Sequence, residues 1–252
     1  NLSLKKLKRF LRFSLFLLTV FFLAFFIAGG TAIFRPSLFD AMPNMQEMRR
    51  LVFLRDAVNE RVRQRERYVT IDAIPQSLQE AVVAVEDSRF YSHCGFDPGA
   101  IARATLVNLQ YGRIEEGAST ITQQLAKNLF LSDEQSLGRK FEEALLALDL
   151  EAHYSKDEIL ELYLNTIYFG SGFYGVHEAS IGYFGKEPEE LELPETSMLA
   201  GIPNAPSVYS PYVDFILAKK RQIVVLDAMK RNGCITETIA ESAKIKPLYF
   251  AR

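Results

Sequence analysis

Hydrophobic positions recur with a helical period along most of this chain, and no run between Ile71 and about Gly233 alternates in the manner of a β-strand. In "IPQSLQEAVVAVEDSRF", four apolar residues from Leu78 to Val85 fall at i, i+3, i+4 and i+7. Further helices are expected at about 119–131, 136–154, 156–169 and 193–202, and another should begin at Asp97 and Pro98. The pattern therefore predicts an all-α fold class.

A longer apolar run lies near the start. No charged residue occurs from Phe13 to Phe34, and such a run can cross roughly 30 Å of hydrocarbon as one helix. The basic residues before it predict a cytoplasmic N-terminus, with everything after Phe34 on the other side of the membrane. A cleavable signal peptide is the alternative, although the run is longer than the usual apolar region of such a peptide.

The segment "QEMRRLVFLRDAVNERVRQRER" reads as an amphipathic helix rich in arginine. It is either a solvated helix with ion pairs or a helix that lies near anionic lipid, and the sequence leaves both open. The predicted organisation is a cytoplasmic basic segment at 1–12, a transmembrane helix at 13–34, a linker with this juxtamembrane helix at 35–68, a globular domain at 69–235 and a tail at 236–252.

Composition narrows the function classes. The net charge is −2, so no overall positive field points to nucleic acid. Cys94 and Cys234 are the only cysteines, and in an oxidising compartment they are able to pair, but nothing in the sequence shows that they do. No His/Cys group has the spacing of a zinc site.

Two acids, Glu86 and Asp87, end the apolar stripe of the 74–90 segment. They either cap a helix end, or one of them is held beside a cleft to move a proton. Glu86 borders the buried stripe, and partial burial raises the pKa of a carboxylate and suits it to acid–base work. Asp87 points elsewhere and is suited to holding the next loop. His93, taken alone, is more often structural than a base.

In "GASTITQQLAKN", one helical face carries hydroxyl, amide and amine groups and the other is apolar. An ordinary amphipathic helix with a capping box between Thr120 and Gln123 accounts for the pattern. A polar face of this kind, with Lys127 and no acid among its main members, also suits a bound anion or sugar. Both interpretations stand at this point.

Two later helices carry further charged groups. Arg139, Lys140 and Glu143 lie within one turn, as an ion-pair network or as a phosphate clamp. Glu161 and Asn165 form a narrow polar strip on a helix that is apolar nearly all round, so Glu161 needs a partner or a wet cavity. It is either a structural salt-bridge partner, for instance of Arg139 or Lys140, or a second active-site acid.

Taken in order, "EDSRFYSHCGFD", "GASTITQQLAKN", "RKFEEALLALDLE" and "KDEILELYLNTIYFGSGFYG" resemble the peptidoglycan glycosyltransferase domain of class A penicillin-binding proteins and monofunctional peptidoglycan transglycosylases. The resemblance covers about Val69 to Met229. It implies a lysozyme-like fold of two lobes, the smaller one dipping into the membrane. It also implies polymerisation of lipid II into glycan strands with release of undecaprenyl diphosphate. The sequence carries no transpeptidase signatures and looks like the monofunctional kind, unless it is a piece of a longer protein.

The resemblance also implies roles. Glu86 is the general base for the acceptor 4-hydroxyl in an inverting reaction, and Glu161 is the second acid, acting on the diphosphate directly or through a divalent cation, Mg²⁺ or Mn²⁺, held mainly by the substrate. Residues matched to substrate binding or its support are Asp87, Phe90, His93, Gly117, Ser119, Thr120, Gln123, Gln124, Lys127, Asn128, Arg139, Lys140 and Glu143. The expected partners are lipid II, the growing lipid-linked strand, membrane lipid and other cell-wall synthesis proteins, at the bacterial inner membrane.

One departure from the pattern stands between the second and third motifs. Gln135 occupies a position where the family usually has an arginine that helps to hold the donor diphosphate. Glutamine supplies neither the charge nor the bidentate fork, so donor binding should be weaker or be compensated by Lys127, Arg139 and a metal ion.

The alternatives to a polymerase are a lysozyme-like hydrolase of glycan strands and a non-catalytic scaffold that binds lipid II.

Overall fold

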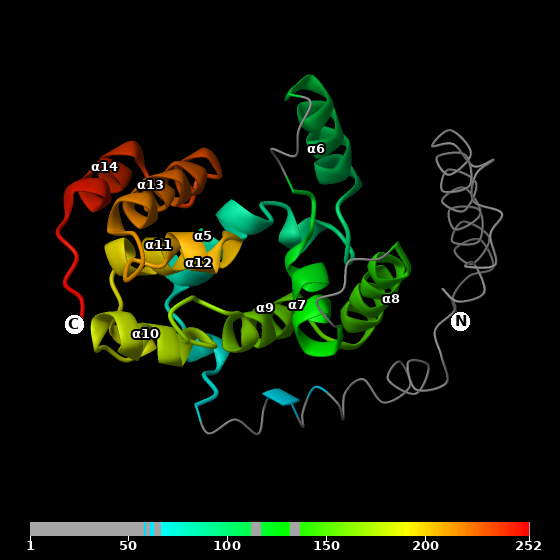
Figure 1. Ribbon diagram of the computed structural model, residues 1–252, viewed down its shortest axis with the longest axis horizontal. Coiled ribbons are helices and arrows are strands. Elements are labelled where there is room, and N and C mark those ends of the chain that lie inside the picture. The colour runs from blue at the N-terminus through cyan, green and yellow to red at the C-terminus, as the bar shows by residue number, and fades with distance from the viewer. Residues whose placement is uncertain (1–57, 59–60, 63–66, 112–116, 132–136, 252) are drawn as a thin grey trace. The chain divides into compact units, whose positions relative to one another are not determined.

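The computed structural model describes residues 58, 61–62, 67–111, 117–131 and 137–251 (Figure 1). The chain divides into two compact units, residues 1–43 and residues 44–252, and all described residues belong to the second. The predicted transmembrane helix at 13–34, most of the juxtamembrane helix and Gln135 lie outside the described residues. Within them, none of the helices has the length and apolar character needed to cross a membrane.

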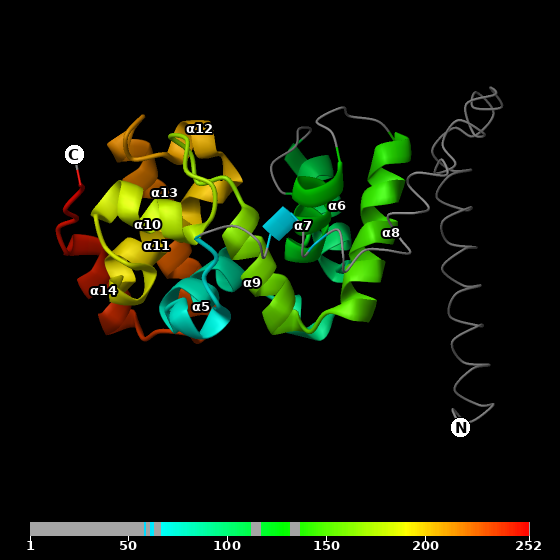
Figure 2. The same ribbon diagram turned by 90° about the horizontal axis from the view of Figure 1, so that it is seen from below.

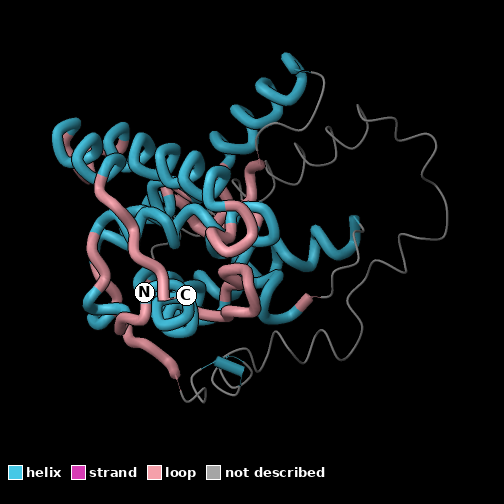
Figure 3. The backbone as a smooth tube through the Cα atoms, turned by 60° about the vertical axis from the view of Figure 1, so that its left-hand side comes forward, coloured by secondary structure: helices cyan, strands magenta, loops and turns pink. Residues whose placement is uncertain are grey.

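The described chain is helical, as predicted, and contains no β-strand, only two isolated bridges (Figure 3). The α-helices are α5 (Gln76–Glu86), α6 (Pro98–Tyr111), α7 (Ile121–Phe130), α8 (Leu137–His153), α9 (Lys156–Thr166), α10 (Val176–Phe184), α11 (Leu193–Gly201), α12 (Pro206–Tyr209), α13 (Phe215–Arg231) and α14 (Glu237–Ile245). Short 3-10 helices are η2 (Ile71–Ala73), η3 (Phe90–Ser92), η4 (Pro188–Glu190) and η5 (Ile202–Asn204).

The predicted helix start at Thr120 is confirmed. Its side chain accepts a hydrogen bond from the backbone of Gln123, and the Gln123 side chain accepts one from the backbone of Thr120. Ser155 and Glu158 form the same reciprocal pair at the start of α9. Each pair satisfies backbone N–H groups that have no partner inside the helix, so both helices begin at a defined residue.

Two sets of helices position the site. α5 packs against α11 and α13, while α7 packs against α8 and α9 (Figures 1 and 2). Leu78 and Val82 of α5, Leu125 of α7 and Leu160 of α9 all belong to one buried hydrophobic cluster. The apolar stripe that the spacing from Leu78 to Val85 predicted is therefore the face that α5 buries. Because this face is buried, the position of Glu86, the last residue of α5, is fixed as well.

The segment predicted as a tail contains α14, which packs against α13 and buries Ala240 and Ala243. Helix α6 is different. Of its residues only Ala104 is buried, whereas Ile101, Leu106, Leu109 and Tyr111 are exposed. This helix is drawn at the top of Figure 1, with one end free of the other labelled helices.

Candidate active site

A cleft of about 950 Å³ is lined by the end of α5, the starts of α6 and α7, α8, the α11–α12 region and α13. Its described lining carries six Lys or Arg side chains and four Asp or Glu side chains, so its balance is cationic. The predicted site residues that line it are Glu86, Asp87, Gly117, Ser119, Thr120, Gln124, Lys127, Arg139, Lys140 and Glu143. Its described lining does not include Phe90, His93, Gln123, Asn128 or Glu161.

Glu86 ends α5 in this cleft, with a side chain that is only 7% exposed. Its carboxylate accepts hydrogen bonds from Gln124 Nε2 at 3.1 Å and from an Arg221 guanidinium nitrogen at 3.3 Å. Burial raises the pKa of Glu86, and these two donors offset only part of the rise. The direction predicted from the sequence is thus confirmed, and a carboxylate with a raised pKa is a better proton acceptor.

The hydrogen bonds around Gln124 fix which way its amide faces. Tyr163, buried on α9, donates its hydroxyl hydrogen to Gln124 Oε1 at 3.0 Å. The amide oxygen is therefore engaged by the tyrosine, and the amide nitrogen is directed to Glu86. Burial keeps the pKa of Tyr163 well above its usual value, so the tyrosine stays protonated and remains a donor.

Arg221 was not among the predicted site residues. It lies on α13, and its side chain, 15% exposed, pairs with Glu86, donates to the Gly201 carbonyl and lies 5.7 Å from the ring centre of Tyr209. A Cβ atom at Gly201 would come within 2.9 Å of Arg221 Cγ, so a glycine at that position makes room for the arginine stem. The only local signal was its place in "KKRQIVV", a basic stretch that reads equally well as a solvated helix face.

Asp87 holds the ends of two helices together. Its carboxylate accepts from His93 Nε2 at 2.9 Å and from the backbone N–H of Ile121 at 3.1 Å, which is the first residue of α7. A carboxylate at a helix N-terminus is favoured by the helix dipole. Phe90 is buried, its ring centre lies 6.3 Å from that of His93, and Lys156 Nζ lies 4.4 Å from its ring centre. The structure thus places these first-motif residues where they fix Glu86 relative to α7.

On α8, Lys140 forms an ion pair with Glu143, and its Nζ lies 3.5 Å from Ser119 Oγ. Glu143 is buried, with a side chain only 2% exposed, while Lys140 is half exposed to the cleft. The predicted ion pair is therefore present, and it lies in the same cleft as Glu86. Glu86, Asp97 and Glu143 are thus buried carboxylates of this lining that each face a cation, Arg221, Arg89 and Lys140 respectively.

Glu161 has other partners than expected. Tyr68 donates its hydroxyl hydrogen to Glu161 Oε1, and the backbone N–H of Ile71 donates to Oε2 at 2.6 Å. Beside it, Asn165 bonds both the N–H and the carbonyl of Val69, at 2.8 Å each. The polar strip on α9 holds the segment 68–71 in place. The sequence was right that this carboxylate needs a partner, but that partner is neither Arg139 nor Lys140.

The described residues do not form a metal site of their own, because no three His, Cys, Asp or Glu side chains among them gather in a way that could hold an ion. Cys94 and Cys234 are both free. The charge available to an anionic group in the cleft comes from side chains such as Lys127, Arg139 and Lys140.

A model of the Transglycosylase family matches residues 55–230. The chain belongs to the peptidoglycan transglycosylase family. The match begins before the predicted start of the globular domain at Val69 and ends within α13, so it contains every residue of the cleft named above. Two further lining residues, Arg231 and Asn232, follow its end.

Relatives of this transglycosylase chain agree with that membership. It is 51% identical over 181 residues to Penicillin-binding protein 1A of Aquifex aeolicus, covering 72% of this chain and 25% of the relative. It is 48% identical over 189 residues to Penicillin-binding protein 1A of Neisseria flavescens, covering 75% and 24%. The chain thus spans about a quarter of the length of these relatives. A crystal structure of Penicillin-binding protein 1A from Haemophilus influenzae aligns with a TM-score of 0.46 at 25% identity, covering 75% of this chain and 19% of that one.

Proposed function

We propose that this chain polymerises lipid II into β-1,4 glycan strands. The 4-hydroxyl oxygen of the acceptor, an incoming lipid II, attacks the anomeric carbon of the donor, the growing lipid-linked strand. The new C–O bond forms as the bond to the diphosphate oxygen breaks, so the anomeric configuration inverts and undecaprenyl diphosphate leaves with the electron pair. The acceptor proton passes to the base.

The observation that carries this proposal is the environment of Glu86. Its carboxylate is shielded from water, has a raised pKa, and opens onto a cleft in which cationic side chains outnumber acids. Those features suit proton removal from a sugar hydroxyl, with Gln124 and Arg221 holding the carboxylate in place. When Glu86 takes up the proton, it becomes neutral at the moment when negative charge builds on the departing diphosphate.

The leaving group needs charge stabilisation rather than a strong acid, because a diphosphate is already a good leaving group. Lys127, Arg139 and Lys140 line the cleft and are suited to this task. Glu143 orients Lys140 through its ion pair. We therefore infer that Glu143, and not Glu161, is the carboxylate that acts on the diphosphate side, by positioning Lys140.

We also propose that a divalent cation, Mg²⁺ or Mn²⁺, takes part through the substrate diphosphate. The described residues do not fit a protein-held metal, since they form no three-ligand group and Glu161 is engaged by Tyr68 and Ile71. Most ligands of such an ion would have to be oxygens of the substrate diphosphate. No step of the reaction above is routed through it.

We also propose an anchored location at the bacterial inner membrane, with the catalytic domain outside. The uncharged run at 13–34 and the basic residues before it favour that orientation. The exposed apolar residues of α6, among them Leu106 and Leu109, are suited to contact with lipid, where the substrate is itself anchored. Other cell-wall synthesis proteins are the expected partners.

The test is to supply the purified protein in detergent with fluorescent lipid II and, separately, with preformed peptidoglycan. We expect polymer from lipid II and no sugar release from peptidoglycan. Release of sugars without use of lipid II would instead indicate a hydrolase, which uses an acid to protonate a sugar leaving group and admits water. Binding of lipid II without turnover, across pH values and divalent cations, would indicate a scaffold.

A further inference from the structure

Arg221, the cation that pairs with Glu86, is held by three contacts. One of its guanidinium nitrogens donates to Glu86 Oε1 at 3.3 Å, and its Nε donates to the Gly201 carbonyl at 3.3 Å. The guanidinium carbon also lies over the ring of Tyr209, 5.7 Å from the ring centre, within the distance at which a guanidinium is attracted to an aromatic face. Both hydrogen bonds are longer than is usual for N–H···O, so the ring is a substantial part of what directs the guanidinium.

Tyr209 is the last residue of α12, which has only four residues. A helix this short does not keep its place by itself, because isolated short helices are unstable in water. The loop after α9 supports it, since a Cβ atom at Gly170 would come within 2.6 Å of the Pro206 carbonyl oxygen. The next residue, Ser171, has a φ of 53°, in the left-handed region that residues with a side chain seldom adopt. Such a conformation persists only where the surrounding contacts hold it.

A chain of hydroxyl groups joins this loop to the residue after Tyr209. Ser210 is fully buried, and its Oγ lies 2.7 Å from Ser171 Oγ and 2.8 Å from the Tyr183 hydroxyl oxygen. Tyr183 donates its hydroxyl hydrogen to the Phe169 carbonyl at 2.9 Å. Ser210 therefore donates to Tyr183, and Ser171 donates to Ser210. These bonds fix Ser210, and with it the backbone that carries the Tyr209 ring.

We propose that Tyr209 is a positioning residue for the general base, with its ring directing the guanidinium of Arg221 toward the carboxylate of Glu86. This inference rests on the proposed function, because it takes Glu86 as the base. Tyr209 lines the same cleft as Glu86 and Arg221, and none of the roles proposed above requires it. Its effect passes through Arg221, which contacts both the ring and the carboxylate.

The orientation of Arg221 matters because its charge affects how readily Glu86 ionises. Burial raises the pKa of Glu86, the hydrogen bond from Gln124 and the charge of Arg221 lower it, and the charge of Asp87 adds to the rise. From α9, Tyr163 donates to Gln124 and not to the carboxylate. Other cations that line the cleft are Arg103, Lys127, Arg139, Lys140 and Arg231. A guanidinium that turns away from Glu86 leaves the carboxylate less often ionised at acid pH.

The experiment measures kcat/KM for lipid II polymerisation against pH in the wild type and in variants of Tyr209. Tyr209→Leu and Tyr209→Met remove the ring with two different side-chain shapes, and Tyr209→Phe keeps it. Tyr249→Leu is the control for loss of an aromatic ring, because Tyr249 is 77% exposed and lies outside the cleft lining. Circular dichroism confirms that each variant is folded before its rates are compared.

The variants without the ring should lose about two- to fivefold more kcat/KM on the acid limb than on the plateau, the factor that a partly exposed cation–π contact provides. Tyr209→Phe should follow the wild-type acid limb, and Tyr249→Leu should match the wild type at every pH. A loss of equal size at every pH would overturn the inference, since a merely structural role lowers activity uniformly. No polymer from the wild type at any pH would instead overturn the proposed function.

A double-mutant cycle tests whether the effect passes through Arg221. In the Arg221→Gln background the acid limb has already moved to higher pH, so Tyr209→Leu should cause no further move. A second move of the same size would show that Tyr209 acts by another route, and would overturn the inference while leaving Glu86 as the base.

A further readout does not depend on turnover. In protein labelled with ¹³C at the glutamate carboxyl carbons, the NMR signal of Glu86 is identified by its absence from Glu86→Gln. The midpoint of its titration should lie at a higher pH in Tyr209→Leu than in the wild type, and Tyr209→Phe should keep the wild-type midpoint. Equal midpoints in Tyr209→Leu and the wild type would contradict the positioning of Arg221, whatever the protein does to lipid II.

Discussion

The sequence put forward two carboxylates as catalytic, Glu86 and Glu161. They lie in regions whose neighbouring charged and polar groups differ. Glu86 opens onto the cationic cleft and is held by side chains, Gln124 and Arg221. Glu161 lies on α9, outside the described lining of the cleft, and is held by Tyr68 and by the backbone of Ile71. The carboxylate of Glu86 faces a cleft that a substrate can enter. The carboxylate of Glu161 instead binds the segment 68–71 to α9.

If Glu86 acts as the base and Glu161 does not, as proposed here, burial and polarity do not by themselves mark a catalytic acid. Both residues are acids at the edge of a buried apolar stripe, and both make two hydrogen bonds. What separates them is the chemistry of the neighbouring space. Substitution of Glu86 should therefore lower activity without lowering stability, and substitution of Glu161 should lower stability with little effect on activity.

The largest expected effect is that of Glu86→Gln. Glutamine keeps the shape but cannot take up the acceptor proton, so kcat for lipid II polymerisation should fall by about 10²- to 10⁴-fold. Polymer formation is followed on gels with labelled lipid II. Glu189→Gln, at an exposed acid outside the cleft lining, is the control for loss of one acid. A Glu86→Gln rate within about threefold of the wild type would remove Glu86 from the role of base.

Lys140→Gln should have the next largest effect. It removes a cation from the cleft and leaves the buried carboxylate of Glu143 without its partner, so kcat/KM should fall by about tenfold. Lys246→Gln, which breaks the exposed ion pair with Glu192, is the matched control and should leave the rate unchanged. The loss should be smaller at high salt, where the wild-type cleft attracts the diphosphate less strongly.

Arg221→Gln should move the acid limb of the pH–rate profile. Arg221 holds the pKa of Glu86 below the value that burial alone would set, so its removal raises that pKa further. The base acts as the carboxylate, and kcat/KM should therefore begin to fall at a higher pH on acidification than in the wild type. Lys220→Gln, one position away and outside the lining, should keep the wild-type profile. An acid limb that shifts downward would contradict the pairing.

The smallest effect on activity is expected for Glu161→Gln, which should stay within about threefold of the wild type. The expected cost is to stability, because the bonds to Tyr68 and Ile71 weaken, by about 1 kcal/mol in the free energy of unfolding. Thermal unfolding measured by circular dichroism checks this.

Glu86→Gln should do the reverse at neutral pH. The folded-state pKa of Glu86 lies above its unfolded value, so the native state binds more protons between the two values, and stability is lost as pH rises through that window. Glutamine removes this penalty, so Glu86→Gln should unfold at a temperature equal to or above that of the wild type at pH 7 to 8. A lower unfolding temperature at this pH would count against the raised pKa.

The features of the site that depend on neighbouring residues in the chain could be predicted from the sequence. The helical spacing from Leu78 to Val85 predicted both α5 and the emergence of Glu86 at its buried edge, and the capping pair of Thr120 and Gln123 predicted the start of α7. These predictions succeeded because each depends on residues within a few turns of one another. The lysozyme-like two-lobed arrangement, the transmembrane helix and the effect of Gln135 stay predictions.

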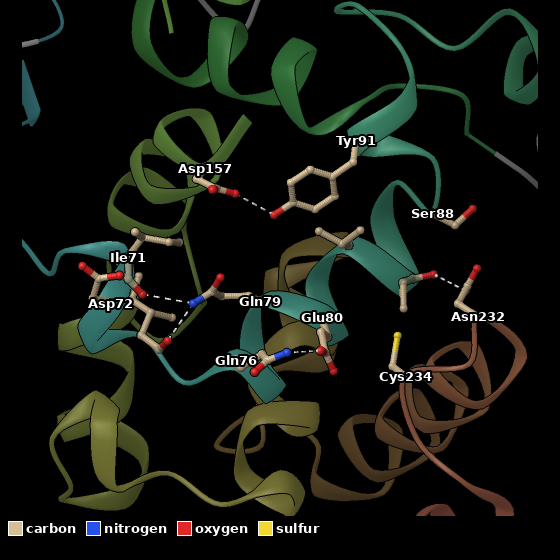
Figure 4. A pocket seen from close by; sticks show the side chains of 13 residues that line it. Ile71, Asp72, Gln76, Gln79, Glu80, Ser88, Tyr91, Asp157, Asn232 and Cys234 are labelled. Atoms are coloured by element: carbon tan, nitrogen blue, oxygen red, sulfur yellow. Dashed lines mark hydrogen bonds between the residues drawn. The ribbon is translucent and has the colours of Figure 1, made fainter. Parts of the chain in front are cut away.

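What the sequence missed depends on contacts between distant segments. Arg221 stands 135 positions after Glu86, and no local pattern joins them. Glu161 reaches Tyr68 across 93 positions, and nothing near Glu161 identifies that partner. A cavity of about 660 Å³ beside α5 (Figure 4) is likewise lined by segments as far apart as Ile71 and Cys234. Packing of α5 against α13 and of η2 against α9 brings these residues together.

The most direct test of the central claim is the ratio of initial rates of Glu161→Gln and Glu86→Gln in one lipid II polymerisation assay, at equal concentrations of folded protein. The account predicts a ratio above about 30, because only Glu86 takes up the acceptor proton. A ratio near one, or a slower Glu161→Gln, would contradict the assignment of the base to the end of α5.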